Sequence, residues 1–301
     1  MPELPEVETT VRGLQKKIVG KTIQSVWSNY QKKDHVRKEE IKNLSFFNGF
    51  KKKIVGSKIE AVKRRGKNIL IHLDNEFVIL THMKMTGHFL FGKYKKTKEA
   101  WEPLDLKSDL GNSFSRHVRF VLEFTDSTHL ALSDARKFAK ITIVSKSDLA
   151  TTPHLNTLGT EILSPSFTNK IMKEKLQTKS AWPIKTALME QSLFVGIGNI
   201  YADELLWLAS VHPERLVSSL EDKEFNLMYK NVKPLLQKGI ALKGNSTSDY
   251  RTVDGTPGKF QEHQKAYQNT GLPCSKRECS GIIQRVVVRG RSSHYCSKHQ
   301  K

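Results

Sequence analysis

The first six residues, Met-Pro-Glu-Leu-Pro-Glu, bring together an amine and two carboxylates. A proline after Met1 is small enough to permit excision of that methionine, which would leave Pro2 as the mature N-terminus with a secondary amine. Such an amine can attack an electrophilic carbon and form an iminium, provided that a neighbouring group moves protons for it. Glu3 and Glu6 are the neighbouring proton carriers. The stretch therefore predicts nucleophilic catalysis by a terminal amine.

The ionisation of this amine bears on the prediction. An α-amino group has a pKa of about 7.7–8.0 against about 10.4 for lysine, so at neutral pH it is roughly a hundredfold more often neutral than a surface lysine. The ring nitrogen of proline is more basic than a typical α-amine. Nearby cations must therefore help to keep Pro2 unprotonated.

The same stretch also has a purely structural interpretation. Pro5 is preset for the first turn of a helix, and acidic residues there favour a helix N-terminus. Gly20 stands where a helix C-terminus is expected, after apolar residues that trace one helical face. This face consists of Val7, Val11, Leu14 and Ile18. The two interpretations are compatible, because a buried helix N-terminus can hold a nucleophile.

The charge balance indicates a polyanionic partner. The chain of 301 residues has 50 Lys and Arg against 30 Asp and Glu, a formal net charge of +20. Such an excess repels itself unless a partner neutralises it, and nucleic acid is the usual partner; a merely soluble basic surface is the alternative. The basic residues occur in runs, as a binding footprint requires: Lys51–Lys53, Lys63–Arg65 with Lys67, and Arg285, Arg289 and Arg291.

Membrane insertion and secretion are not expected. The sequence contains no run of about 18 apolar residues, the length that a membrane span needs. Glu3 and Glu6 interrupt the basic-then-apolar order of a secretory leader. We therefore expect a cytoplasmic protein with no membrane partner.

Short strands with turns between them dominate the first half. Residues 68–73 and 77–80 flank the turn Asp74-Asn75-Glu76 and predict a hairpin. Residues 117–124 and 129–133 predict a second hairpin, and residues 141–144 a further strand. Successive strands without helices between them favour a β-sandwich over alternating βαβ units.

The second half changes character twice. Residues 147–168 contain several Thr, Ser and Pro residues and predict a linker. Helical periodicity begins near Asn169 and continues to Ile240. The last forty residues carry all three cysteines and a β-branched run that ends at Arg289-Gly290, which predicts a β-ribbon with a turn.

The cysteines form a metal-ligand pattern in the final 28 residues. Cys274 and Cys279 are separated by four residues, and Cys296 and His299 by two, with sixteen between the pairs. A cytosolic setting argues against disulfides, whereas this spacing is typical of a structural zinc site, here of Cys3His type. His294 is close enough to compete with His299, and three free thiols are the alternative. A closed site of four ligands supplies folding energy rather than catalysis.

A glycine-rich motif lies between two helical stretches, residues 184–193 and 202–209. Residues 196–201 read Gly-Ile-Gly-Asn-Ile-Tyr. Glycines let backbone amides approach a ligand closely, and a helix N-terminus after them favours phosphate. Taken alone, the motif fits an ordinary helix-turn-helix loop better than a phosphate site.

Several motifs in order resemble the formamidopyrimidine-DNA glycosylases, bacterial repair enzymes for oxidised purines. Residues 1–8, Met-Pro-Glu-Leu-Pro-Glu-Val-Glu, resemble the start of that family. Residues 195–204, Val-Gly-Ile-Gly-Asn-Ile-Tyr-Ala-Asp-Glu, and residues 211–215, Val-His-Pro-Glu-Arg, resemble its helix–two-turn–helix. The resemblance continues through residues 254–260, Asp-Gly-Thr-Pro-Gly-Lys-Phe, and into the zinc finger, so it spans the whole chain.

The resemblance implies a mechanism. Pro2 would attack C1′ of the damaged nucleotide, displace the base and leave an iminium-linked sugar. Glu3 would act as general acid/base at the sugar ring, and Glu6 would assist proton transfer. Elimination would then break the 3′ and afterwards the 5′ phosphate bond. Lys67 matches the family's strand lysine and would contact phosphate near the lesion; otherwise it is one more charge on a basic face.

The resemblance also implies DNA contacts. Met85 and Phe138 would be apolar wedges that fill the gap left by the flipped nucleotide, and Arg136 would face the widowed base. From pattern alone, both apolar residues would belong to the core. Residues 244–260 match a loop that closes over the extruded base. The remaining predicted contacts are phosphate contacts by Lys185, Asn199 and Arg291, and further DNA contacts by Arg116 and His117.

The chain departs from the family pattern at the cysteine cluster and at three residues beside the predicted wedges. The family usually has four cysteines spaced by two and two, whereas here the first gap is four and His299 replaces the last cysteine, which leaves the ligand set open. Lys84 replaces a glycine, Ala135 a proline and Lys137 an arginine. These three residues lie beside the wedges, so they predict an altered lesion or opposite-base preference, and none removes a catalytic group.

Together these observations predict an α+β multidomain protein. It would combine an N-terminal two-layer β-sandwich with flanking helices (1–146), a linker (147–168), a helix–two-turn–helix domain with the lesion-covering loop (169–262) and a zinc-finger β-hairpin (263–301). We expect a monomeric bacterial cytoplasmic enzyme, used at the nucleoid, that binds damaged double-stranded DNA and one structural Zn2+ ion.

The function predicted from the sequence is a bifunctional DNA glycosylase/AP lyase that excises oxidised purines, including 8-oxoguanine and formamidopyrimidines, in base excision repair. The endonuclease VIII branch, which prefers oxidised pyrimidines, is an alternative. It commonly has glycine in place of Leu4 and lacks the long covering loop. A non-catalytic DNA-binding module or a zinc-ribbon RNA-associated protein would explain the charge but would leave the N-terminal hexapeptide without a role.

Overall fold

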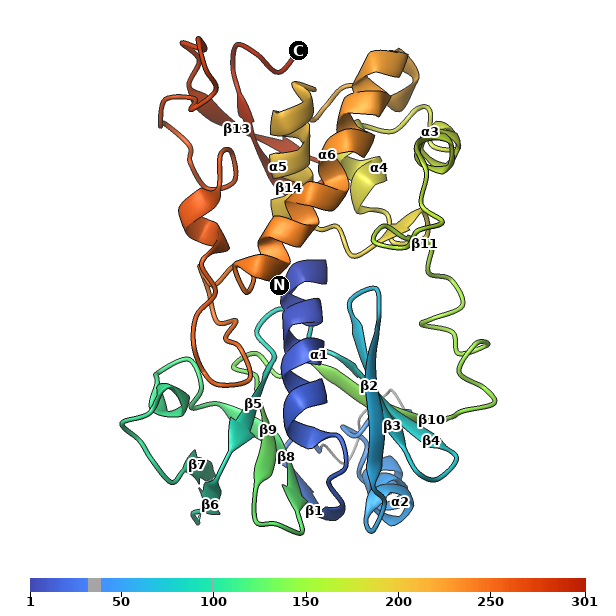
Figure 1. Cartoon of the computed structure of the whole chain (residues 1–301), viewed down its shortest axis with the longest axis vertical. Coiled ribbons are helices and arrows are strands. Elements are labelled where there is room, and N and C mark those ends of the chain that lie inside the picture. Colours follow the sequence, from blue (N-terminus) through green and yellow to red (C-terminus); the bar gives the residue numbers. More distant parts are fainter. Residues whose placement is uncertain (32–38, 99) are drawn as a thin grey trace. The chain divides into compact units, whose positions relative to one another are not determined.

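The computed structural model describes residues 1–31, 39–98 and 100–301. The chain forms two compact units, and each is built from two separate segments of the sequence (Figure 1). Unit 1 contains Met1–Asn156 and Leu242–Lys259, and unit 2 contains Thr157–Ala241 and Phe260–Lys301. The segment Leu242–Lys259, here called the strap, therefore packs with the N-terminal half, whereas the sequence placed it with the helical domain.

Helix α1 (Leu4–Ile18) opens unit 1 as its amphipathic pattern predicts. Val7, Val11, Leu14 and Ile18 are all buried, on one face. The helix ends before Val19, and Gly20 follows with φ +87°, a left-handed conformation that glycine adopts without steric cost. α1 packs against three strands, so its N-terminus is held by the core of the unit.

Two antiparallel sheets form the predicted sandwich. The first has the order β1 (Ile23–Ser28), β8 (Val118–Phe124), β9 (His129–Ser133) and β5 (His88–Gly92). The second has the order β10 (Lys140–Ser145), β4 (Phe77–His82), β3 (Asn68–Leu73) and β2 (Ile59–Arg65). Both predicted hairpins are present, as β3–β4 and β8–β9.

One hydrophobic cluster joins the two sheets to the helices. It contains Phe120 and Leu132 from the first sheet, Ile71 and Ile141 from the second, and residues of α1. Helix α2 (Leu44–Ile54) adds Phe50, whose ring lies 6.2 Å from that of Phe120. Short elements complete the unit: β6 (Tyr94–Lys96), β7 (Trp101–Pro103) and the 3-10 turn η1 (Asp109–Gly111).

Unit 2 is helical and carries the ribbon. Its helices are α3 (Asn169–Gln177), α4 (Ile184–Met189), α5 (Asn199–Ala209) and α6 (Asp222–Ala241), with the 3-10 turns η2 (Val217–Ser219) and η3 (Phe260–His263). The predicted ribbon is β13 (Ile283–Val288) paired with β14 (Arg291–Cys296). Within the described part of the chain, no helix combines the length and apolarity that crossing a bilayer requires.

The predicted linker 147–168 is partly regular structure. The first segment of unit 1 ends at Asn156, and residues 157–168 belong to unit 2. There β11 (Thr160–Glu161) pairs in parallel with β12 (Phe194–Val195), and Gly159 leaves no room for a side chain against the Leu193 backbone. A two-residue strand is too short to produce a periodic pattern, so the sequence did not predict it.

His88 makes the stability of unit 1 sensitive to acid. The ring is fully buried on β5, and its Nδ1 lies 3.2 Å from the Thr86 carbonyl oxygen. Burial lowers the pKa of His88 to about 4, with a smaller lowering by Arg251. Between about pH 6.5 and 4, His88 is therefore neutral in the folded chain, whereas in the unfolded chain it binds a proton.

We predict that the free energy of unfolding falls as the pH drops from about 6.5 toward 4, by up to about 1.4 kcal/mol per pH unit for this group. His88→Gln should remove this share of the slope in urea unfolding measured across that range. His154→Gln, which changes an exposed histidine, is the matched control. Identical slopes for both variants and the wild type would contradict the prediction.

Candidate active site and nucleic-acid interface

The predicted catalytic residues lie at the buried N-terminus of α1. Glu3 is the N-cap residue, and Pro2, Glu3 and Glu6 are all buried, whereas Met1 is 41% exposed. The Glu6 Oε2 atom accepts the Glu3 backbone N–H at 2.7 Å, as in a capping box. The helix-start interpretation and the active-site interpretation therefore apply to the same atoms.

The second oxygen of Glu6 binds the strap. Its Oε1 atom accepts the backbone N–H of Asn245 at 2.8 Å, and the Tyr250 hydroxyl donates to the Glu6 carbonyl at 3.0 Å. Gly244 has φ +80°, and a Cβ there would lie 2.7 Å from Glu6 Cγ. Glu6 thus connects the backbone beside Pro2 to Asn245, which lies 239 residues further along the sequence.

Further contacts hold the strap against unit 1. The Phe91 backbone N–H donates to the Val253 carbonyl at 2.7 Å, and the Asn112 amide donates to the Gly255 carbonyl at 3.1 Å. Gly13 on α1 lets Val253 approach, because a Cβ at Gly13 would lie 2.5 Å from the Val253 side chain. These contacts explain why the strap belongs to unit 1 although the helices of unit 2 flank it in sequence.

Lys67 lies in a braced turn between β2 and β3. The turn contains Gly66 at φ +56°, and Lys67 is only 6% exposed. Glu8 of α1 accepts hydrogen bonds from Arg64 and Arg12, both at 2.8 Å. Burial raises the pKa of Glu8, but the hydrogen bonds from Arg64 and Arg12 outweigh it, and the net shift is downward. A charged Glu8 therefore fixes this turn to α1.

The two predicted wedge residues, Met85 and Phe138, meet Arg136, the residue predicted to face the widowed base, on the surface. Met85 is 43% exposed and Phe138 is 46% exposed. The Arg136 Nη1 atom lies 3.2 Å from Met85 Sδ, and the guanidinium carbon is 4.5 Å from the Phe138 ring centroid. Pattern alone would have buried both apolar residues. Their exposure is what an intercalating wedge requires.

Arg116 and His117 lie next to this surface loop. Arg116 is exposed and His117 is half-buried. The His117 carbonyl accepts the backbone N–H of Asp134, and Asp134 is the first residue of the loop that carries Arg136. Burial lowers the pKa of His117, and Arg119 and Arg116 lower it further.

Unit 2 holds the glycine-rich motif at the start of α5. The Gln191 side chain accepts the Gly196 N–H at 3.1 Å and donates to the Ile197 carbonyl at 2.9 Å, so it braces the loop. Lys185 is 1% exposed, and its ammonium group contacts the Asp203 carboxylate and the Asn199 carbonyl. Since the ammonium group is directed inward, its predicted phosphate contact stays a prediction, as does that of Asn199.

Two buried acids that the sequence did not single out hold the C-terminal segment: Asp203 contacts the ribbon, and Glu204 contacts residues 265–267. Asp203 accepts the Ser293 hydroxyl at 2.5 Å and the His294 backbone N–H at 2.9 Å. Glu204 accepts the backbone N–H groups of residues 265–267 at 2.9 Å to 3.1 Å. Burial raises the pKa of Glu204. The occurrence of two adjacent acids within the otherwise apolar helix α5 was the feature of the sequence that could have predicted their buried role.

The cysteines and one histidine converge beside α5. The ligand atoms of Cys274, Cys279, Cys296 and His299 all lie within 4.8 Å of one another. The His299 Nδ1 atom lies 3.4 Å from Cys274 Sγ, and its Nε2 lies 3.1 Å from the Trp207 carbonyl. This cluster could hold a metal ion. His294, the competing histidine, contacts Asp203 through Nδ1 at 3.1 Å.

Arg291 begins β14, directly after the ribbon turn. Its side chain is exposed, and Arg289 and Gly290 form the turn with φ of 45° and 78°. Two left-handed residues in a row are the geometry of a tight hairpin turn. The ribbon therefore presents Arg291 at its tip, where the sequence predicted a phosphate contact, and that role remains a prediction.

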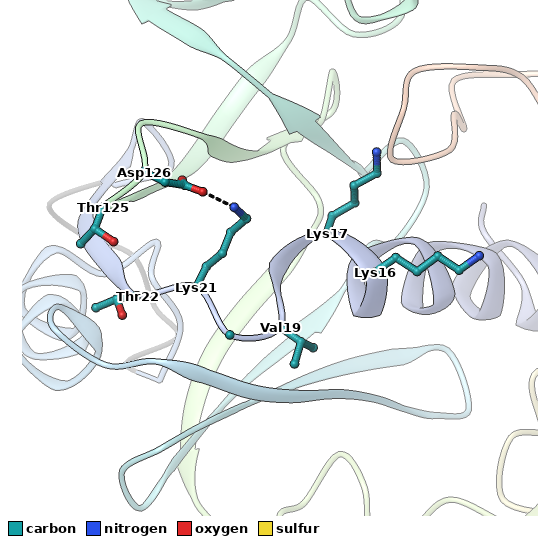
Figure 2. A pocket seen from close by; sticks show the side chains of 8 residues that line it. Lys16, Lys17, Val19, Lys21, Thr22, Thr125 and Asp126 are labelled. Carbon is teal, nitrogen blue, oxygen red and sulfur yellow. Dashed lines mark hydrogen bonds and ion pairs between the residues drawn. The ribbon is translucent and has the colours of Figure 1, made fainter.

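A separate pocket of about 500 Å³ lies at the other end of α1 (Figure 2). Lys21 forms an ion pair with Asp126 there. The helix has 15 residues, so this end is about 20 Å from Pro2. None of the predicted site residues lines it; the lining is Lys16, Lys17, Val19, Gly20, Lys21, Thr22, Thr125 and Asp126.

Two family models match the chain. The formamidopyrimidine-DNA glycosylase N-terminal domain matches residues 1–141, and the formamidopyrimidine-DNA glycosylase H2TH domain matches residues 158–251. A formamidopyrimidine-DNA glycosylase of Lactococcus lactis subsp. lactis is 34% identical over 296 residues, which cover 98% of each chain. The chain therefore belongs to the formamidopyrimidine-DNA glycosylase family, and the resemblance inferred from its motifs is confirmed.

Solved structures agree with this assignment. The Lactococcus lactis Fpg in complex with DNA that contains an abasic site has a TM-score of 0.84, with 32% identity and 99% coverage of both chains. A MutM structure with DNA that contains carbocyclic 8-oxo-G has a TM-score of 0.83, with 31% identity and full coverage of both chains. The predicted fold class, a β-sandwich followed by a helical domain and a cysteine-rich ribbon, is confirmed.

Gly244 offers a test of the contact between Glu6 and the strap. In Gly244→Ala, the methyl group would displace the Glu6 carboxylate from the Asn245 and Glu3 N–H groups. We predict a loss of excision of at least about tenfold, in addition to a stability loss of about 1–2 kcal/mol for an alanine at positive φ.

The matched control is Gly56→Ala, because Gly56 has φ +86° but nothing within 4 Å of its Cβ position. It should share the stability loss, measured by urea unfolding, and keep the excision rate on lesion-containing duplex DNA. Equal excision by the two variants would show that the Gly244 contact with Glu6 does not matter for activity.

Proposed function

We propose that the chain excises oxidised purines, including 8-oxoguanine and formamidopyrimidines, from duplex DNA in the bacterial cytoplasm, as a bifunctional glycosylase/AP lyase with Pro2 as nucleophile. The observation that carries the proposal is the environment of the N-terminus. Pro2 is buried next to Glu3 and Glu6, and Glu6 binds backbone N–H groups through both oxygens. A nucleophile held by a rigid helix start loses little entropy on attack.

The first chemical stage is displacement of the base. After removal of Met1, the neutral Pro2 nitrogen attacks C1′, the bond from C1′ to the base breaks, and the base leaves with a proton. Glu3, which is buried beside the amine, exchanges protons with the opening sugar ring. The product is an iminium between the Pro2 nitrogen and C1′.

The second stage is strand cleavage. The iminium acidifies the C2′ hydrogen, and its removal expels the 3′ phosphate by β-elimination. A further proton loss at C4′ expels the 5′ phosphate by δ-elimination. Hydrolysis of the iminium then releases the sugar fragment and regenerates Pro2. The single nucleophile therefore serves both activities, and Lys67 would hold a phosphate near it.

Access to C1′ requires that the damaged nucleotide leave the stack. Flipping costs a few kcal/mol, and apolar wedges offset part of this cost. The exposed group of Met85, Arg136 and Phe138 supports this role. Arg116, His117, Lys185, Asn199 and Arg291 remain the proposed contacts to the rest of the DNA.

The cysteine cluster is proposed to bind one structural Zn2+ ion. Four ligand atoms at 2.0–2.3 Å from a tetrahedral centre are roughly 3.3–3.8 Å apart. Three of the six separations match this range, at 3.4 Å for Cys274–His299 and 3.6 Å for Cys279–Cys296 and Cys279–His299, and all six lie within 4.8 Å. The Trp207 carbonyl beside Nε2 fixes the tautomer that leaves Nδ1 available as ligand. Zinc would stabilise the ribbon that carries Arg291.

The nucleophile is tested by borohydride trapping on duplex DNA with 8-oxoguanine or a preformed abasic site. Wild type should give a covalent adduct, and Pro2→Gly should lose most of it, because glycine presents a primary amine in a different conformation. Glu3→Gln should slow base release by about a hundredfold, the scale of general acid/base catalysis. Mass spectrometry should find Pro2 as the first residue. Undiminished incision by both variants, or an active enzyme that retains Met1, would refute the mechanism.

The fourth ligand is tested by metal content. His299→Ala should reduce bound zinc and weaken duplex affinity by about tenfold or more, whereas His299→Cys should restore binding because Zn2+ accepts four thiolates. His294→Gln is the control and should retain zinc. If His299→Ala keeps its zinc while His294→Gln loses it, the assignment of the ligand is wrong.

A further inference from the structure

Asp134 is a fully buried carboxylate that the proposed chemistry does not use. Its Oδ2 atom accepts the Tyr30 hydroxyl at 2.7 Å and the Ala139 backbone N–H at 2.8 Å, and its Oδ1 atom accepts the Thr86 hydroxyl. Burial and the nearby Asp134 charge raise the pKa of Tyr30, so the phenol remains a donor. An acid placed out of water in this way requires such donors, and here it has three.

The hydrogen bonds of Thr86 have a fixed direction. An ionised carboxylate can only accept, so the Thr86 hydroxyl gives its one proton to Asp134. Its oxygen lone pairs remain for the backbone N–H of Arg136, which lies 3.1 Å away. The chain of bonds therefore runs from Arg136 N–H to Thr86 and on to Asp134, and each member fixes the next.

This chain joins the two loops that carry the exposed wedge residues. Thr86 follows Met85 directly, and Asp134 begins the turn that contains Arg136 and Phe138. Asp134 accepts two backbone hydrogen bonds from this turn. Its carbonyl accepts the Lys137 N–H at 3.3 Å, and its carboxylate accepts the Ala139 N–H at 2.8 Å. The two loops lie 48 residues apart in sequence at Thr86 and Asp134. The pairing of β5 with β9, which sets His88 opposite Ser133, brings the loops together, and the buried contact of Thr86 with Asp134 links them directly beyond the ends of these strands.

We infer that Asp134 and Thr86 are positioning residues for strand intercalation: they hold Met85, Arg136 and Phe138 as one rigid wedge while the damaged nucleotide is flipped. The inference rests on the proposed function, in which these three side chains enter the DNA. It predicts a defect specific to steps that need the wedge. Chemistry at Pro2 on a sugar that carries no base should be spared.

The experiment uses Thr86→Val, which keeps the shape of the side chain and removes the hydroxyl. Single-turnover excision of 8-oxoguanine paired with cytosine should slow by about tenfold. The fluorescence rise of a 2-aminopurine next to the lesion, which reports unstacking, should slow by the same factor. Borohydride trapping on a preformed abasic duplex should stay within about twofold of wild type.

Thr81→Val is the matched control. Thr81 is a fully buried threonine on β4, and its hydroxyl makes no hydrogen bond to any described residue. This variant should retain all three wild-type rates. Tyr30→Phe, which removes one of the three donors, should give a weaker form of the Thr86→Val defect.

A double-mutant cycle identifies the wedge as the route of the effect. Met85→Ala removes one wedge side chain, and adding Thr86→Val to it should slow excision by much less than Thr86→Val does alone. Full additivity, or an equal loss on abasic and 8-oxoguanine substrates, would overturn the positioning role. Failure of the wild type itself to form the covalent adduct would instead overturn the proposed function.

Discussion

The Glu6 carboxylate is the constraint on which the N-terminal site depends. Its two oxygens bind the Glu3 N–H and the Asn245 N–H, so one buried side chain fixes both the helix start and the strap. An acid that is 1% exposed is costly to bury unless donors satisfy it. Any movement of the strap therefore changes the hydrogen bonding of the residue beside Pro2.

Buried acids repeat this arrangement elsewhere in a chain of net charge +20. Asp134 joins the two wedge loops, Asp203 joins Lys185 to the ribbon, and Glu204 fixes residues 265–267. In each case a carboxylate accepts from several donors, which lie in loops for Asp134 and Glu204 and on β14 and α4 for Asp203. Basic side chains can then face a polyanion, while the acids that order the loops remain out of its reach.

Two of the residues that depart from the family pattern, Lys84 and Lys137, have a left-handed backbone. Lys84 and Lys137 have φ of 57° and 56°, although left-handed backbone costs a residue with a Cβ about 1–2 kcal/mol. Lys84 precedes the wedge residue Met85, and Lys137 separates Arg136 from Phe138. A glycine at position 84 would adopt this backbone without that cost, so Lys84 adds a charge beside Met85 at a cost in stability.

The sequence by itself determined α1, the two hairpins, the start of the helical region and the cysteine-rich ribbon, because each has a local pattern with a period or spacing of its own. Motif order also identified the family. The family resemblance, but not the local pattern, predicted that Met85 and Phe138 are exposed. Only the tertiary structure decided that Lys185 is buried on Asp203, that His299 rather than His294 joins the cysteines, and that the strap packs in unit 1. These outcomes depend on contacts between residues far apart in the chain. Such contacts leave no periodic trace, since a buried acid and its donors satisfy one another only after the fold has brought them together.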